Sequence, residues 1–115
     1  MNSKRYLVLG LLASFAAAAM AQSTAAWPTR GPIKLVAVFP PGGSVDQVAR
    51  ILQVPLQAAL GQTVIVENKG GASGSIGAAA VAASPADGYT FAVVFDTHGV
   101  NPALIPNLPF DSKKD

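Results

Sequence analysis

The apolar positions of the chain fall into separate runs, and their spacing predicts alternating strands and helices. Residues 33–39 (IKLVAVF) are apolar at six of seven positions, which is typical of a strand buried on both faces. Residues 44–60 carry apolar side chains at helical spacing, and Gly61 is a usual helix stop. The pattern continues with a strand, an alanine-rich helix and a further strand over residues 63–66, 75–83 and 89–95.

This β-α-β-α-β order predicts an α/β fold with a parallel sheet, because parallel strands need a crossover connection between them. Tyr89, Phe91 and Phe95 are predicted to be core residues of the third strand. The segment after Phe95 holds three of the nine prolines, and no third full helix is predicted there.

The predicted helix over residues 44–60 carries start signals and one conflict. Ser44 and Gln47 have the spacing of a capping box, in which the two side chains satisfy free backbone amides. Asp46 lies in the first turn, where its charge complements the helix dipole and its side chain can bond the preceding loop. Pro55 lacks an N–H and clashes with the carbonyl one turn back, so a kink or break is predicted there.

The first 21 residues have the pattern of a secretory signal peptide. Lys4 and Arg5 precede a run of apolar or small residues over 6–19, and residues 19–21 form an A-x-A cleavage site. The run is shorter than the roughly 20 residues that a spanning helix needs, and no cysteine follows the cleavage site. We therefore expect release into the periplasm without a stable membrane anchor.

Removal of this leader would leave a chain without net charge. Residues 22–115 contain six Lys or Arg and six Asp or Glu, so the formal charge of +2 belongs to Lys4 and Arg5. The basic pI is therefore no evidence for a nucleic-acid partner. The absence of cysteine excludes disulfides and thiolate metal sites.

Three segments are predicted to meet at one edge of the sheet. Ligands of open parallel sheets bind at the carboxyl ends of the strands, and free amides at a helix N-terminus favour an anion. Two of the segments are rich in glycine, which lets the backbone approach a ligand closely. The segments are residues 40–44, 70–76 and 96–99.

The glycine spacing does not match the common phosphate motifs. No Gly-Lys pair follows either cluster, and Gly71, Gly74 and Gly77 depart from the G-x-G-x-x-G fingerprint. A carboxylate is the better match, because a few backbone amides and hydroxyls suffice to bind it. A simpler alternative is a flexible loop over residues 70–77 whose glycines permit tight helix–sheet packing.

No catalytic, metal or cofactor site is predicted. His98 is the single histidine and has only Asp96 close to it in sequence, so a hydrogen-bonding role in a loop is the simpler interpretation. Ser44 has no neighbouring base, and no G-x-S-x-G elbow is present. A small secreted hydrolase is therefore a hypothesis without residues to support it.

Three stretches resemble successive motifs of one protein family, namely FPPGGSVDQVAR, VIVENKGGASGSIGAAAVAASPADGYTF and HGVNPALIPNLPFDSKKD. The family is that of the Bug-type substrate-binding proteins of tripartite tricarboxylate transporters, and the resemblance runs almost continuously from Trp27 to Asp115. It implies the N-terminal part of a type II periplasmic-binding-protein-like domain. It also implies ligand-binding roles for three sets of residues. Gly42, Gly43 and Ser44 would help line the ligand cleft, the loop around Ala72, Ser73 and Gly74 would supply amides or hydroxyls to a ligand carboxylate, and Thr97 and His98 would lie on a third side.

The resemblance also implies a ligand, transport partners and a difference in chain length. The expected ligand is a small di- or tricarboxylate or a related organic acid, which membrane permease subunits would receive, and no cofactor is expected. Members of the family are considerably longer, so residues 22–115 are expected to form a truncated first α/β lobe. The alternative is a truncated, non-binding remnant that does not fold stably, because ordering each residue costs about 1–2 kcal/mol.

Overall fold

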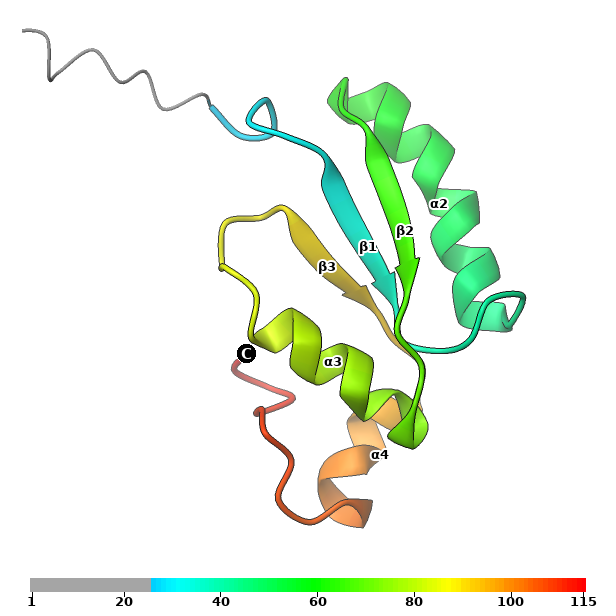
Figure 1. Cartoon of the computed structure of the whole chain (residues 1–115), viewed down its shortest axis with the longest axis vertical. Coiled ribbons are helices and arrows are strands. Elements are labelled where there is room, and N and C mark those ends of the chain that lie inside the picture. The colour runs from blue at the N-terminus through cyan, green and yellow to red at the C-terminus, as the bar shows by residue number, and fades with distance from the viewer. Residues whose placement is uncertain (1–25) are drawn as a thin grey trace, which may run out of the picture.

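The computed structural model describes residues 26–115, and the predicted signal peptide over residues 1–21 lies outside this range. The described chain forms a three-stranded parallel sheet with helices on its two faces (Figure 1). The strand order is β2-β1-β3, with Ile33 opposite Val64 and Lys34 opposite Thr90. The predicted parallel α/β fold is confirmed, with strands β1 (Ile33–Ala37), β2 (Val64–Asn68) and β3 (Thr90–Val93).

Helices α2 (Ser44–Leu60) and α3 (Ser75–Ala82) cover opposite faces of the sheet. Successive side chains of a strand point to opposite faces of the sheet, so β1 can pack against both helices. Ile33 and Leu35 pack with Leu56 and Leu60 of α2, whereas Val38, just beyond β1, lies against α3. β1 is therefore the centre of the core, and four of its five residues are buried.

Helix α2 continues through Pro55 without interruption, so a break at this residue is wrong, whereas a kink stays a prediction. The helix is clamped to β2 on both sides of the proline, because Gln53 donates to the Val64 carbonyl at 2.7 Å and Gln57 accepts from the Val64 amide at 3.1 Å. Pro55 itself is exposed, so water can satisfy the carbonyl that loses its intrahelical donor. Tertiary contacts thus outweigh the local cost of the proline.

A helix follows β3, in contrast to the sequence prediction. Helix α4 (Thr97–Leu104) contains Gly99 and Pro102, both poor helix formers. It is held from outside by Asn101, which is 3% exposed and donates its side-chain amide to the Ser73 carbonyl at 2.9 Å. None of the helices between residues 26 and 115 combines the length and apolar character needed to cross a bilayer.

Two of the three aromatic residues predicted for the core are largely exposed. Phe91 is 44% and Phe95 is 51% exposed, while Tyr89 is half-buried against the Ile33 cluster. The reason is topological: β3 is an edge strand, with β1 as its one neighbouring strand in residues 26–115, and Phe95 lies beyond the end of β3. The core prediction is therefore wrong for Phe91 and Phe95.

Candidate functional site

The two glycine-rich loops lie side by side at the carboxyl edge of the sheet (Figure 1). Pro40 of the β1–α2 loop contacts Gly70 of the β2–α3 loop so closely that a Cβ at Gly70 would lie 3.1 Å from the proline ring. Asn68, at the end of β2, donates to the Phe39 carbonyl at 3.2 Å. Segments that are about thirty residues apart in sequence thus form one surface.

The β1–α2 loop is closed by Asp46 instead of by the predicted capping box. Helix α2 begins at Ser44 with Gly43 as its N-cap, and no side chain caps it. Gln47 donates its side-chain amide to the Gly42 carbonyl at 3.1 Å. The Gly42 amide donates to Asp46 Oδ2 at 2.8 Å. A capping box needs Ser44 to stand just before the helix, whereas α2 already begins at Ser44, so this prediction is wrong. The loop-bonding role predicted for Asp46 is confirmed.

The β2–α3 loop has an unusual backbone over four consecutive residues. Gly71, Ala72, Ser73 and Gly74 have φ of 128°, 46°, 54° and 85°. A left-handed conformation costs a non-glycine residue about 1–3 kcal/mol and persists only where surrounding contacts enforce it. Here Ser75 Oγ donates to the Ala72 carbonyl at 2.8 Å, and the Ser73 carbonyl accepts from α4.

These contacts use the carbonyls of the loop and leave amides unused. Among the hydrogen bonds of residues 26–115, none has the backbone amide of Ser44, Ala72 or Ser73 as donor. Ala72 and Ser73 lie immediately before α3, where the helix dipole favours a negative charge. These unused amides at a helix N-terminus make the surface chemically suited to an anion.

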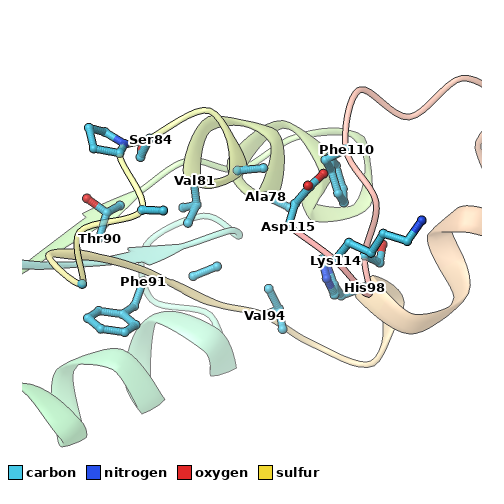
Figure 2. A pocket seen from close by; sticks show the side chains of 16 residues that line it. Ala78, Val81, Ser84, Thr90, Phe91, Val94, His98, Phe110, Lys114 and Asp115 are labelled. Atoms are coloured by element: carbon cyan, nitrogen blue, oxygen red, sulfur yellow. The ribbon is translucent and has the colours of Figure 1, made fainter.

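The third predicted segment is only partly brought to this surface. Thr97 begins α4, and α4 reaches the β2–α3 loop through the Asn101 contact. The His98 ring instead stacks on Phe110, with centroids 5.8 Å apart. It lines a groove of about 650 Å³ along β3 together with residues such as Val94 and Lys114 (Figure 2). No residue of the glycine-rich loops lines that groove, so a ligand role for His98 stays a prediction.

Asp46 is a charged group bonded directly to the β1–α2 loop, and its partners keep it ionised. The Arg50 side chain, the Gly42 amide and the Asn68 side-chain amide lower the pKa of Asp46 from 3.8 to about 2. These hydrogen bonds stabilise the charged carboxylate, and the resulting decrease in pKa outweighs the increase caused by burial.

This depressed pKa predicts a loss of stability in acid. A group whose pKa is lower in the folded state stabilises the fold above its unfolded pKa, and this contribution disappears as the group becomes protonated. We expect the urea midpoint to fall as the pH decreases from about 4 to about 2. In Asp46→Asn this part of the pH dependence should be absent; an identical profile would contradict the assigned contacts.

Two residues that connect the segments of the candidate site were not predicted from the sequence. Asn68 joins the β1–α2 and β2–α3 loops, and Asn101 joins α4 to the β2–α3 loop. The available signal was weak: Asn68 comes just after the predicted strand over residues 63–66, a common place for polar contacts, whereas Asn101 lies in the segment predicted as a loop. In residues 26–115, no three His, Asp or Glu side chains come together in a metal-binding arrangement.

Comparison with known proteins identifies the family. The model of the tripartite tricarboxylate transporter family receptor matches residues 48–115. The chain belongs to this family. Protein BugT of Bordetella pertussis (strain Tohama I) is 42% identical over 118 residues, which cover 100% of this chain and 36% of BugT. This receptor-family chain thus spans about a third of the length of that relative.

Solved structures agree with the family and with the partial coverage. The periplasmic binding protein BugD is 38% identical, with a TM-score of 0.69 over 72% of this chain and 28% of BugD. Rpa4515 of R. palustris, determined with adipate, is 36% identical with a TM-score of 0.71 over 78% of this chain and 30% of its own. MatC (Rpa3494) of Rhodopseudomonas palustris, determined with malate, is 33% identical with a TM-score of 0.68 over 75% and 30%. The described residues therefore have the fold of part of a periplasmic binding protein.

Proposed function

We propose that this chain is a periplasmic receptor that binds a small organic carboxylate for a tripartite tricarboxylate-type transporter. The observation that carries the proposal is the pair of unused amides at Ala72 and Ser73, beside the loop that contains Ser44. Amides at a helix N-terminus and nearby hydroxyls bind a carboxylate without a metal or cofactor. The family is one of receptors, so the chain is proposed to bind its ligand without catalysis.

The relatives support the chemical class of the ligand. Adipate and malate, which accompany two of the similar structures, each carry two carboxylates. We propose that one carboxylate meets the amides of Ala72 and Ser73 and that other contacts choose among acids. Membrane permease subunits of the transporter are the proposed recipients of the ligand, and the signal-peptide pattern of residues 1–21 supports delivery to the periplasm.

A titration followed by amide NMR tests the proposal. Cells expressing all 115 residues should yield a periplasmic product that lacks residues 1–21, which its mass will show. We expect adipate, malate or a tricarboxylic acid to shift the amide signals of Ala72, Ser73 and Ser44, because a charged acceptor deshields the amides that it binds.

The neutral diamide of adipic acid is the matched control. It has the same carbon chain but no carboxylate, so it should leave these amide signals in place. Equal responses to the acid and the diamide, or shifts confined to the groove that His98 lines, would refute the proposed site.

A non-binding remnant that does not fold stably is the second candidate. Its supporting observation is the exposure of large apolar side chains, including Ile51 at 71% and Leu104 at 73%. Apolar surface left in water does not offset the conformational entropy lost on folding. This candidate predicts a collapsed amide spectrum that no acid changes.

A further inference from the structure

The Asp46 carboxylate is buried among three segments of the chain. The residue is 3% exposed. Its Oδ2 accepts the Gly42 amide at 2.8 Å, and its Oδ1 accepts the Asn68 side-chain amide at 2.9 Å. Arg50 Nε lies 3.1 and 3.0 Å from the two oxygens. An ionised group out of water needs such partners, and the Gly42 amide, the Asn68 amide and Arg50 supply them here.

Asn68 extends this connection to the ends of two strands. Its Nδ2 carries two hydrogens, and it donates to Asp46 at 2.9 Å and to the Phe39 carbonyl at 3.2 Å. Phe39 leads out of β1, and Asn68 is the last residue of β2. Asn68 therefore connects the ends of β1 and β2, where the two glycine-rich loops begin, to the Asp46 carboxylate.

We propose that Asp46 is a positioning residue of the candidate binding site: its carboxylate occupies the Gly42 amide and, through Asn68, holds the two glycine-rich loops in one arrangement. This inference rests on the proposed function. The sequence predicts that Gly42 contacts the ligand, but its amide already donates to an anionic group of this chain. A ligand carboxylate is thereby directed to the amides of Ser44, Ala72 and Ser73, which meet no acceptor within residues 26–115.

The arrangement requires a carboxylate and not an amide of the same shape. Both oxygens of Asp46 face donors, and a carboxylate only accepts. In Asp46→Asn one oxygen becomes an NH₂ group, which must face the Gly42 amide or the Asn68 amide. Donor then meets donor, and one of the two loop contacts is lost. The substitution is nearly isosteric, so it tests the contacts with little change in packing.

Amide hydrogen exchange on the exported chain tests the positioning role without any ligand. In Asp46→Asn, Gly42 should exchange roughly tenfold faster or more, the change expected from losing one charge-assisted hydrogen bond. The signals of Gly70 and Gly71 should shift with it. Unchanged exchange at Gly42 would overturn the proposal.

Two control variants separate positioning from simple helix stabilisation. Arg50→Gln removes the i,i+4 ion pair but keeps the contacts of Asp46 with Gly42 and Asn68, so Gly42 exchange should stay close to wild type. Asp111→Asn removes one charge from the C-terminal segment and should change neither loop. Equal acceleration in Asp46→Asn and Arg50→Gln would mean that Asp46 acts only within α2, and would overturn the proposal.

Asn68→Ala covers the case in which Asp46→Asn does not fold. It retains the Asp46–Gly42 contact and should still shift amide signals of both loops, whereas a response confined to residues 69–74 would overturn the proposal.

Titration of the wild-type chain with adipate and malate distinguishes failure of the positioning role from failure of the proposed function. A chain that binds neither acid refutes the proposed function, while the exchange rate of Gly42 still decides the role of Asp46.

Discussion

Replacing Gly77 with alanine is expected to destabilise the chain by about 3 kcal/mol, because the added methyl group has no space. A Cβ at Gly77 would lie 2.5 Å from the Lys69 carbonyl oxygen and 2.8 Å from Val38 Cγ1. The Lys69 backbone cannot easily yield, since its amide donates to the Ala37 carbonyl at 2.9 Å. Relief requires α3 to move away from the sheet, which also displaces the β2–α3 loop. Urea unfolding followed by far-UV circular dichroism measures the loss.

Gly99→Ala is the matched control for this substitution. Gly99 also lies in a helix, but a Cβ there would meet nothing within 4 Å. Alanine is favoured over glycine in a helix by about 0.5–1 kcal/mol, so this variant should be as stable as wild type or slightly more stable. If the two variants unfold at the same urea concentration, α3 does not pack on β1 as described.

Replacing Ile33 with alanine is expected to cost about 3 kcal/mol, within the range for deleting a buried aliphatic side chain and leaving a cavity. Ile33 is 2% exposed and packs against Val64, Leu56 and Leu60. The same denaturation experiment provides the measurement. A large loss would show that β1, β2 and α2 form a cooperative core in this chain.

Ile51→Ala removes the same atoms from a position that is 71% exposed. It should change the free energy of unfolding by less than about 0.5 kcal/mol, as surface substitutions usually do. Equal effects of the two substitutions, or no cooperative transition in either, would favour the unstable remnant over the receptor. The pair therefore bears directly on function, because a pocket made of backbone amides exists only if the fold holds the loops in place.

The predictions of helices and strands were right where neighbouring residues determine the structure, and wrong where contacts between distant residues determine it. The apolar run over residues 33–39 predicted β1, and the helical spacing from Ser44 predicted α2. The failure at α4 has a clear cause: Gly99 and Pro102 argue against a helix, and the contact that holds it joins Asn101 to Ser73, 28 residues away. The exposure of Phe91 likewise depends on the position of β3 at an edge of the sheet, which its own residues do not encode.

The features of the candidate site likewise include some that the sequence predicted and some that it did not. Glycines at two strand-to-helix junctions are visible in the sequence, and they predicted which loops would gather at the carboxyl edge. Which amides in those loops remain unused was not predictable. The Gly42 amide donates to Asp46, whereas Ala72 and Ser73 are held in left-handed conformations with their amides unused.

By itself, the sequence determined the order of strands and helices, the parallel sheet and the edge at which the glycine-rich loops meet. These features follow from apolar spacing, helix start and stop signals and chain direction, which act over a few residues. Only the tertiary structure decided the continuity of α2 at Pro55, the existence of α4 and the occupation of the Gly42 amide by Asp46. Those outcomes depend on where surrounding contacts place each group, such as Gln53 with Val64, Asn101 with Ser73 and Asn68 with Asp46, and the spacing of residues along the chain does not specify them.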